Sequence, residues 1–461
     1  MNNTSELLNA QKAYFNGGET LDIAFRKAQL KKLYQAVTDN QQAIFDALHA
    51  DLNKSPFETY ETEIGIVLEE IRYLIAHLSK WAKPKRMSMP LTLFPATGTV
   101  HAEPYGCVLI MSPWNYPFQL ALDPLAGALA AGNCVVLKPS NYSPETSKVI
   151  RKIIRSIYPE KYVAVIEGGR EANADLLEKR FDYIFFTGGT TVGRLVMESA
   201  AKHLTPVSLE LGGKSPCIVD ESANIDLAAR RIVWGKYLNA GQTCVCPDYV
   251  LAHKNIKQTL IERMQYWITR HYGENPLASP DYAKIITERH YERLNALSDG
   301  KNPANGTLVC GKERDARLCK IAPVILDAPQ ADSPVMSEEI FGPIMPVLEF
   351  TDLEKARDFV IERPRPLALY FFSSSKKNID FIVKRISYGG GCINDTIIHL
   401  ATSKMPFGGV GNSGMGRYHG KYSFDTFSHL KSVLTRGIRP DVSVRYPPYG
   451  EKLGLLKKLL K

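Results

Sequence analysis

The sequence predicts an α/β protein with two doubly wound parallel-sheet domains and a small additional arm. Its 461 residues are more than one hydrophobic core usually organises, which favours two large domains. From about residue 100 onward, short runs of β-prone apolar residues alternate with spans long enough for a crossover helix. This texture is typical of parallel sheets that are covered by helices on both faces.

The first eighty residues are predicted to be helical. Apolar residues recur there over four turns with the i, i+3, i+4, i+7 spacing of one helix face. These residues are Ile64, Val67, Leu68, Ile71, Leu74, Ile75 and Leu78. We expect one long amphipathic helix that ends near Pro84.

Four apolar runs predict a first sheet: YGCVLIMSPWNYP, GNCVVLKPS, YVAVIEGG and YIFFTGG. Each run ends in a small or polar cluster (SPWN, KPS, EGG or TGG), and parallel strands bring such clusters to one edge of the sheet. Doubly wound folds bind their ligands at that edge. The segment FTGGTTVG, residues 186–193, also combines close backbone approach at its glycines with the free amides of a helix start. Because it is not GxGxxG, it does not indicate a dinucleotide by itself.

A second series of runs predicts another α/β domain after the LELGGK turn. It consists of SPCIVD, PDYVLAHK, the helical IKQTLIERMQYWITR, APVILD and IMPVLEF. The stretch RMSMPLTLFPATGTVHAEP differs from both series, since it is apolar, punctuated by proline, and neither helical nor alternating. We interpret it as an arm that packs on another domain or subunit.

Composition indicates an ordinary globular protein, with 44% hydrophobic and 23% charged residues. The net charge of +9 is spread among interleaved acidic and basic residues, so nucleic-acid binding is not expected. The N-terminus MNNTSELLNA has no signal pattern, and no apolar stretch reaches the roughly 18 residues that cross a bilayer. We therefore expect a cytoplasmic protein whose eight cysteines are reduced.

The C-terminus combines basic and apolar residues. Lys452, Lys457, Lys458 and Lys461 alternate with Leu453, Leu455, Leu456, Leu459 and Leu460. On a helix most of the leucines share one side and most of the lysines the other. Such a tail is too short to span a membrane, but contact with an acidic lipid surface is one hypothesis for it.

Cys244, in NAGQTCVCPDY, is the candidate nucleophile. A thiol reacts as its thiolate, which backbone amides or a nearby cation favour, and the turn-like residues 239–241 are compatible with such a field. Cys246 is predicted to point to the other face of an extended strand and to serve packing, with a redox role as the alternative. The remaining cysteines are expected to be buried small hydrophobes. They are Cys107, Cys134, Cys217, Cys310, Cys319 and Cys392.

Glu210 is the candidate base. It lies between apolar residues at the predicted end of a strand in PVSLELGGKSP. Desolvation at such a position raises the pKa of a carboxyl group, and a raised pKa suits a general base near neutral pH. A strand-end glutamate in a salt bridge is the alternative reading.

Seven strings, in order along the chain, resemble the aldehyde dehydrogenase superfamily and in particular its class 3 branch of fatty and aromatic aldehyde dehydrogenases. They are PWNYPF (113–118), LKPSNYSPETS (137–147), FTGGTTVG (186–193), LELGGKSP (209–216), GQTC (241–244), EEIFGP (338–343) and PFGGVGNSGMGRYHG (406–420). The resemblance implies oxidation of aldehydes with NAD or NADP and a homodimer. No metal site is expected.

The resemblance also implies domain boundaries. A Rossmann-like cofactor domain would comprise residues 1–82 and 102–209, and a catalytic domain residues 210–397. An oligomerisation or bridging arm would comprise residues 83–101 and 398–440, followed by a tail at 441–461.

By the same resemblance, Cys244 attacks the aldehyde, Glu210 activates the water that releases the acid, and the Asn115 side chain helps to hold the oxyanion. Lys138 would touch the adenosine ribose, Glu339 would hold the nicotinamide ribose, and the Phe341 ring would lie beside it. The other implied cofactor residues are Trp114, Thr187, Gly188, Gly189, Gly193 and Leu211. The implied walls of an apolar substrate channel are Tyr116, Leu238 and Ile397.

Two positions depart from the family pattern. Asn141 stands where many NAD-selective members have a glutamate that binds the adenosine ribose and repels a 2′-phosphate, so we expect both NAD and NADP to be used. Gly189 replaces a common serine or asparagine. Medium or long aliphatic aldehydes and aromatic aldehydes both remain open as substrates.

Three other readings of the sequence compete with this one. Cys244 and Glu210 alone could make a cysteine hydrolase for esters or thioesters, which would turn over without a cofactor. A coenzyme A acylating dehydrogenase would release no free acid without its thiol acceptor, but it generally lacks the base that Glu210 provides. A catalytically idle structural protein tends to lose the nucleophile.

Overall fold

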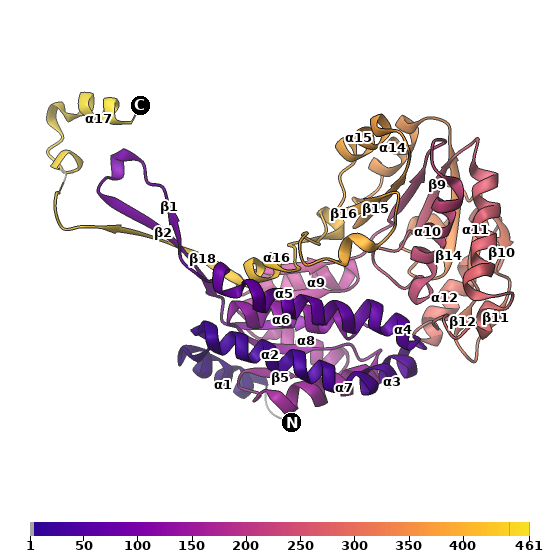
Figure 1. Ribbon diagram of the computed structural model, residues 1–461, viewed down its shortest axis with the longest axis horizontal. Helices are drawn as coiled ribbons and strands as arrows, with labels where there is room; N and C mark the ends of the chain where they lie inside the picture. Colours follow the sequence, from indigo (N-terminus) through magenta and orange to yellow (C-terminus); the bar gives the residue numbers. More distant parts are fainter. Residues whose placement is uncertain (1–3, 442, 461) are drawn as a thin grey trace.

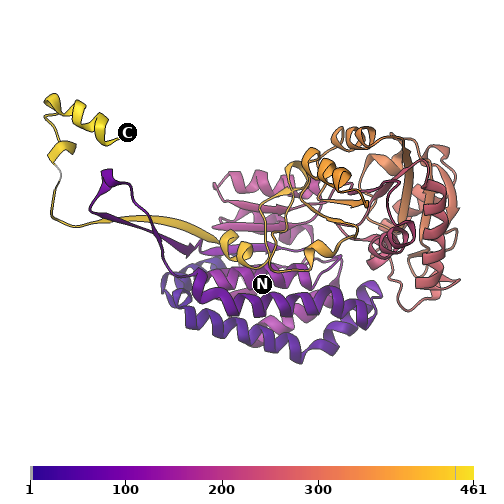
Figure 2. The same cartoon turned by 45° about the horizontal axis from the view of Figure 1, so that its top comes forward.

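The computed structural model describes residues 4–441 and 443–460. Two α/β bodies lie side by side, and a slender arm projects from one of them (Figure 1). Figure 2 shows the same arm clear of both bodies after rotation. The predicted α/β class with parallel sheets is therefore confirmed.

Helices precede the first sheet, as predicted. They are α1 (Thr4–Asn16), α2 (Ile23–Asp39), α3 (Gln41–Leu52), α4 (Pro56–Thr59), the π-helical turn η2 (Tyr60–Ile64) and α5 (Gly65–Trp81). The predicted long amphipathic helix corresponds to η2 and α5 together, and it ends at Trp81. Of its predicted apolar face, Ile75 is half-buried and the other members are buried, so α5 packs against α2 and α6.

The first sheet has the strand order β17-β7-β6-β3-β4-β5. Its strands are β3 (Cys107–Met111), β4 (Cys134–Lys138), β5 (Val163–Val165), β6 (Tyr183–Thr187), β7 (Val207–Glu210) and β17 (Gly414–Met415). Its helices are α6 (Gln119–Ala131), α7 (Pro144–Ile157), α8 (Arg170–Glu178) and α9 (Thr190–Ala201). All neighbours pair in parallel except β17 with β7. The strand order reverses between β3 and β6, which places a ligand crevice at the carboxyl ends of these strands.

The second sheet has the strand order β10-β13-β14-β9-β8-β15-β16, and only β10 pairs antiparallel. Its strands are β8 (Pro216–Val219), β9 (Tyr249–His253), β10 (Thr307–Cys310), β13 (Val324–Asp327), β14 (Ile344–Phe350), β15 (Ala368–Phe372) and β16 (Gly390–Ile393). Its helices are α10 (Ile225–Tyr237), α11 (Lys257–Tyr272), α12 (Glu288–Ser298), α13 (Pro334–Ser337), α14 (Leu353–Ile361) and α15 (Lys376–Arg385). A small ribbon joins β11 (Arg314–Asp315) to β12 (Lys320–Ile321).

The arm is an antiparallel sheet of β1 (Lys85–Met87), β2 (Ala96–Pro104) and β18 (Ser428–Arg436). Its first segment forms strands although its sequence does not alternate: β1 and most of β18 are exposed and β2 is largely half-buried, so neither face has to be wholly apolar. Residues 398–427 lie outside this sheet. They include β17, which extends the first sheet, and the helix α16 (Lys421–Thr426).

Beyond the arm the tail forms the turn η10 (Gly450–Lys452) and the helix α17 (Leu453–Leu459). Four of its leucines are exposed: Leu453, Leu455, Leu456 and Leu460. Lys461 lies outside the described residues. None of the helices in the described part of the chain is long and apolar enough to cross a membrane.

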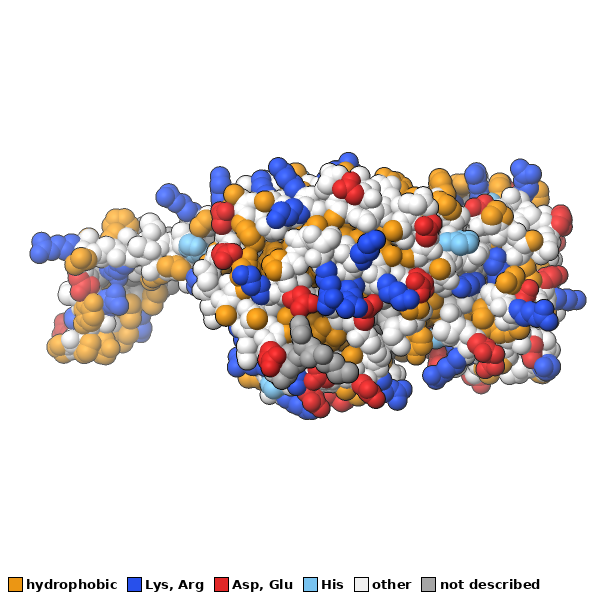
Figure 3. Space-filling model, turned by 90° about the horizontal axis from the view of Figure 1, so that it is seen from below, with side chains coloured by type: hydrophobic (Ala, Val, Ile, Leu, Met, Phe, Trp, Pro, Cys, Tyr) orange, Lys and Arg blue, Asp and Glu red, His pale blue; other side chains and the backbone are white. Residues whose placement is uncertain are grey.

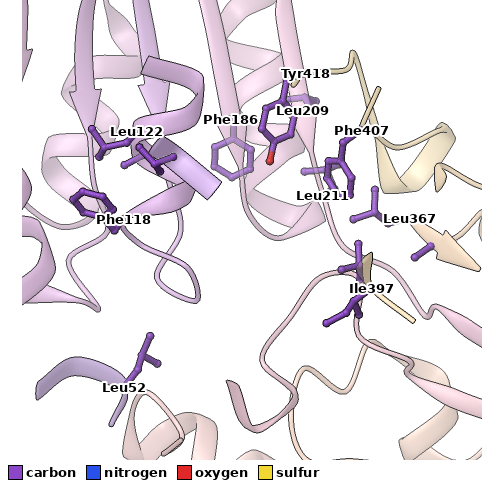
Figure 4. Close-up of a cluster of buried hydrophobic side chains, with 14 of the residues drawn as sticks. Leu52, Phe118, Leu122, Phe186, Leu209, Leu211, Leu367, Ile397, Phe407 and Tyr418 are labelled. Atoms are coloured by element: carbon purple, nitrogen blue, oxygen red, sulfur yellow. The ribbon is translucent and has the colours of Figure 1, made fainter. Parts of the chain in front are cut away.

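A cluster of buried apolar side chains joins the two bodies (Figure 4). Phe118 comes from the start of the α6 region, Phe186 and Leu209 come from strands of the first sheet, and Leu367 comes from the second domain. The segment after β16 contributes Phe407 and Tyr418. Packing from both domains therefore fixes the crevice between them.

Candidate active site

Cys244 lies in a tight turn between α10 and β9. The preceding 3-10 turn, η4 (Leu238–Gly241), has left-handed backbone at Asn239, Ala240 and Gly241, with φ of 50°, 50° and 74°. A Cβ atom on Gly241 would lie 2.3 Å from the carbonyl oxygen of Gly342, so only glycine fits there. Further along, Tyr370 donates a hydrogen bond of 2.5 Å to the carbonyl of Val245. These constraints give the thiol a fixed place.

The predicted position of Cys246 on an extended strand is wrong. Residues 244–246 form a turn and a bend, since β9 begins only at Tyr249. Cys246 is buried, and its thiol donates to the carbonyls of Lys236 and Pro247 at 3.6 and 3.3 Å. All eight cysteines lie in the described residues and are free thiols.

Asn115 follows β3 and is buried beside the cysteine turn. Its side-chain Nδ2 donates to the carbonyl of Gln242 at 3.0 Å. Gln242 is held in turn, because its Nε2 donates to the carbonyls of Asn239 and Lys284, and its Oε1 accepts from the amide of Ile286 at 3.0 Å. The Asn115 amide is therefore tied to the residue two positions before Cys244.

Glu210 ends β7 and is buried. Neither of its carboxylate oxygens has a hydrogen-bond partner within the described ranges. Burial raises the pKa of Glu210 well above its usual value of 4.5. A salt bridge, the alternative reading of this residue, is not found for it among the described residues. Burial therefore makes this carboxyl group a stronger proton acceptor than an ordinary glutamate.

Glu339, like Glu210, lies near Cys244, and its carboxylate approaches the backbone of Gly212. A Cβ atom on Gly212 would lie 2.1 Å from Glu339 Oε2, so a glycine is required there. Burial raises the pKa of Glu339 to about 8 and Asp248 adds to the rise, against the opposing amide of Gly213 and the charge of Lys214.

The Cys244 thiol is protonated in this environment. Burial raises its pKa to about 12, and the carboxylates of Glu339 and Glu210 add to the rise. Hydrogen bonds from the backbone amides of Cys244 and Val245 lower the pKa, as expected for this turn, but burial outweighs them. A positive charge brought beside the sulfur would favour the thiolate.

Two pockets meet at Cys244, each of about 760 Å³ including space open to solvent. This size suits a small organic ligand. The first is apolar and is lined by the predicted channel residues Tyr116, Leu238 and Ile397. The sequence did not single out its other walls, which are Glu61, Thr62, Ile66, Gln119, Leu120, Trp234, Thr243, Ile398, Leu400, Ala401, Phe407, Tyr418 and His419.

The second pocket is more polar and lies at the carboxyl ends of the first sheet. Among the predicted residues it brings together Trp114, Asn115, Thr187, Gly188, Gly189, Glu210, Leu211, Cys244, Glu339 and Phe341. It also contains His290 and Arg293, which sequence reasoning missed. His290 contacts the Trp114 ring edge-on, with 5.1 Å between the ring centroids. Nothing in the α12 sequence distinguishes these two from ordinary surface residues.

Two predicted cofactor residues do not line this pocket. Lys138 ends β4, and its Nζ donates to the carbonyl of Pro139 at 2.8 Å. Burial lowers the pKa of Lys138 to about 8, with Glu167 opposing. Gly193 lies in α9, where a Cβ atom would lie 2.6 Å from Leu211 Cδ2, so this glycine allows helix and strand end to pack closely.

The aldehyde dehydrogenase family model matches residues 2–433 of the chain. The chain belongs to the aldehyde dehydrogenase family. The resemblance drawn from the motifs is thereby confirmed, and relatives named as family 3 members confirm its class 3 branch. A 4,4'-diaponeurosporen-aldehyde dehydrogenase of Staphylococcus aureus is 48% identical over 98% of this chain and 97% of its own length. Aldehyde dehydrogenase family 3 member B1 of Rattus norvegicus is 46% identical over 97% and 95%.

A solved structure described as the substrate-bound state of Staphylococcus aureus AldH superposes with a TM-score of 0.97. It is 46% identical, and the match covers 100% of both chains. A relative from Mus musculus, 43% identical over 98% of this chain and 99% of its own length, is described as an NADP-preferring aldehyde dehydrogenase, and a solved structure from Sinorhizobium meliloti, 29% identical with a TM-score of 0.86 over 95% of this chain and 87% of that chain, as an NAD-dependent one. This aldehyde dehydrogenase accordingly oxidises aldehydes to carboxylic acids with one or both of these cofactors.

Proposed function

We propose that Cys244 is the nucleophile of this aldehyde dehydrogenase and that the apolar and polar pockets hold aldehyde and cofactor on its two sides. The observation that carries the proposal is that Cys244 lines both pockets. The Cys244 thiol first gives up its proton to solvent water; its sulfur then bonds to the carbonyl carbon, the carbon–oxygen double bond opens, and a tetrahedral thiohemiacetal oxyanion forms. Hydride leaves that carbon only after attack, because the collapsing oxyanion then expels it and leaves a thioester.

Asn115 holds the oxyanion in this proposal, together with the backbone amide of Cys244. The hydrogen bond from Asn115 Nδ2 to Gln242 uses one proton of the amide and leaves the other for a substrate oxygen. Fixed donors in a pocket with little water stabilise developing charge strongly, and loss of one such donor costs about 100-fold or more in rate.

Glu210 activates the water that hydrolyses the thioester. Its oxygens have no partner among the described residues and face a pocket that also contains Cys244, and its raised pKa makes it a stronger proton acceptor than an ordinary carboxylate. The water oxygen bonds to the acyl carbon, its proton passes to Glu210, and the sulfur leaves as thiolate. The carboxylic acid is then free to depart.

The polar pocket fits a nicotinamide dinucleotide. Gly189 has open space where a side chain would be, Thr187 Oγ1 is buried without a partner among the described residues, and α9 presents its first amides nearby. Glu339 would hold the nicotinamide ribose, and Trp114 and Phe341 would flank it. When bound, the cofactor accepts the hydride and brings a positive ring beside Cys244.

We further propose use of both NAD and NADP. Asn141 is exposed at the end of the β4 loop and its Nδ2 lies close to Gly169, so no carboxylate from this position repels a 2′-phosphate. An NADP specificity constant a thousandfold below that for NAD would contradict this.

Apolar aldehydes are the substrates that the first pocket favours. Tyr116, Leu238 and Ile397 give it hydrocarbon and aromatic walls, which suit medium or long aliphatic chains and aromatic rings. Titration of an aldehyde panel against NAD and NADP at 340 nm, with Cys244→Ser as the blank, tests the whole assignment. Ester hydrolysis at comparable rate without cofactor would favour the hydrolase reading, and a strict need for coenzyme A would favour the acylating one.

A homodimer joined through the arm completes the proposal. Apolar side chains gather toward the end of the arm and tail, away from the two bodies (Figure 3). Exposed apolar side chains of the arm and of the segment that follows it include Phe94, Leu434 and Ile438, which are exposed by 67%, 52% and 95%. An apolar surface of this kind indicates an interaction site. Sedimentation equilibrium should give twice the chain mass.

Two finer proposals concern location. The free thiols support a reducing compartment, the cytoplasm. The exposed leucines of α17 beside Lys457 and Lys458 support weak contact with acidic lipid. Liposome sedimentation that left all of the protein in the supernatant would remove the lipid contact.

A further inference from the structure

Lys54 is buried beneath the active site, in the short connection between α3 and α4. The chain is fixed on both sides of it. Asn53 ends α3 in the left-handed conformation with φ of 57° and donates through Nδ2 to the carbonyl of Tyr282 at 3.2 Å. Ser55 caps α4 by accepting from the amide of Glu58. The lysine side chain turns inward and is 0% exposed.

The ammonium group of Lys54 has three partners. Its Nζ lies 2.6 Å from Glu63 Oε1 and 3.1 Å from the carbonyl oxygen of Asn115, and it sits 3.9 Å from the centroid of the Tyr116 ring. An ammonium group has three protons and a charge that aromatic faces attract, so these contacts use its full capacity. Two of the three partners belong to the turn after β3 that carries the oxyanion residue.

Glu63 holds the next part of the same turn. Its second oxygen, Oε2, accepts from the amides of Phe118 and Gln119 at 3.0 and 2.9 Å, at the start of α6. The side chain of Glu63 is 0% exposed. The Lys54–Glu63 pair therefore contacts the turn at its middle and at its end.

A second donor reaches the Asn115 carbonyl from the cysteine turn. Asn239 Nδ2 lies 2.8 Å from that oxygen and 3.2 Å from the carbonyl of Gln242, which also accepts from Asn115 Nδ2. The backbone amide of Asn239 is itself held by Glu58 Oε1 at 3.0 Å. The main chain of Asn115 is thus clamped between Lys54 on one side and the Cys244 loop on the other.

Stability alone does not account for this arrangement. Replacement of a buried ion pair by apolar residues of similar volume is often neutral or stabilising, since desolvation of both charges offsets their attraction. What an apolar pair cannot do is donate a hydrogen bond to the Asn115 carbonyl.

We propose that Lys54 is a positioning residue that fixes the Asn115 side-chain amide relative to the sulfur of Cys244. The inference rests on the proposed role of Asn115 as oxyanion donor. Without the Lys54 donor the Asn115 carbonyl relaxes toward Asn239, and its side chain shifts with it. A displacement of about 1 Å in a reacting group can cost about 100-fold in rate.

The test is a double-mutant cycle between Lys54→Met and Asn115→Ala in the full-length enzyme. Methionine keeps an unbranched apolar chain and removes the charge. Single-turnover formation of reduced cofactor with saturating aldehyde is the readout. We expect Asn115→Ala to slow it by about 100-fold and Lys54→Met by about 10- to 100-fold. The combined variant should be within about threefold of Asn115→Ala, because Lys54 acts through Asn115.

Two further variants separate a loss of rate caused by a folding defect from one caused by displacement of Asn115. Lys54→Met leaves the buried Glu63 carboxylate without its ion-pair partner, so the double variant Lys54→Met/Glu63→Gln is measured as well. The double variant should recover thermal stability but not the single-turnover rate. Lys320→Met is the matched control, because Lys320 is a buried lysine that donates to the backbone carbonyl of Leu277 at 3.1 Å and lines neither pocket. It should lower the melting temperature and leave the single-turnover rate unchanged.

Several results would overturn the inference. If the rate reductions of the two single variants multiply in the combined variant, Lys54 acts independently of Asn115. A raised KM for aldehyde with unchanged rate would assign Lys54 to the Tyr116 wall of the apolar pocket instead. A large loss in Asn115→Ala with none in Lys54→Met would remove this inference alone, whereas a small loss in Asn115→Ala would remove the proposed oxyanion role itself.

Discussion

The two pockets that meet at Cys244 are built in different ways. The polar pocket is formed mainly by the turns that follow β3, β6 and β7 at the edge of the first sheet, and the second domain adds Cys244, His290, Arg293, Glu339 and Phe341. The apolar pocket takes side chains from α5, α6 and α10 and from the segment after β16, which are far apart along the chain. Within the described part of the chain, Leu120 and Cys244 are the residues that line both pockets.

This difference gives the polar pocket the reacting groups and the apolar pocket the walls that select among aldehydes. Groups on the ends of packed strands hold their positions to within a small tolerance, as reacting groups must. Side chains on the surfaces of helices can be exchanged without disturbing the sheet, which suits a wall that selects among aldehydes. Substitutions in the two pockets should therefore have different kinetic signatures.

The largest effect should come from Cys244, one of the two residues that line both pockets. Cys244→Ser should lower aldehyde oxidation by at least about a thousandfold, because a serine hydroxyl in the same place has no comparable nucleophilicity. Cofactor affinity, measured by fluorescence titration, should stay nearly unchanged. Cys246→Ser is the matched control, since Cys246 lines neither pocket, and it should keep most of the activity. Equal losses in both variants would contradict the assignment.

Glu210→Gln probes the polar pocket. The amide cannot take a proton from water, so steady-state turnover should fall by about 100- to 10,000-fold. A rapid burst of reduced cofactor, close to one per active site, should persist because acylation of Cys244 does not require the base. Stopped-flow absorbance at 340 nm measures both phases. Loss of the burst together with turnover would show that Glu210 acts before the thioester forms.

Leu238→Phe probes the apolar side with a smaller effect. The larger ring narrows the pocket, so the specificity constant for a long aliphatic aldehyde should fall by about tenfold relative to that for a short one. The KM for NAD should not change, because Leu238 does not line the polar pocket. A change in the NAD constant of similar size would mean that the pockets are not independent.

The smallest effect concerns stability and pH. The pKa of Glu210 is raised in the folded state, so the unfolded chain loses its proton first as pH rises above about 4.5. The folded state is therefore destabilised at neutral pH. Glu210→Gln should unfold with a higher free energy than the parent protein above pH 4.5, and this advantage should shrink as pH falls toward 4.5. Denaturant unfolding of both proteins between pH 4.5 and 8 measures this difference in the free energy of unfolding. A difference that did not change with pH would contradict a raised pKa of Glu210.

The polar pocket was largely predictable from the sequence, whereas the apolar one was not. Short apolar runs ending in glycine or polar residues mark strand ends, and strand ends share one edge of a parallel sheet. By contrast, periodicity showed which side of α5 faces the core, but Ile66 lies off that side and still reaches the apolar pocket. Which remote side chains converge on it depends on how the two domains pack.

Lys54 and Cys246 show the same limit at single residues. A lysine in a short connection is ordinarily exposed, and only the tertiary structure reveals that its partner Glu63 lies on the next π-helical turn, below Asn115. Cys246 appeared to belong to a strand because apolar residues surround it. The left-handed residues of the preceding turn displace the start of that strand to Tyr249.

Each pocket reaches the surface through its own residues, Gly189 on the polar side and Glu61 on the apolar side. The sulfur can therefore be approached from two directions. With coenzyme in the polar pocket and the acyl chain in the apolar one, as proposed above, coenzyme could leave and be replaced while the acyl chain is still attached. The order of binding and release would then depend on residence times and not on one ligand blocking the exit of the other.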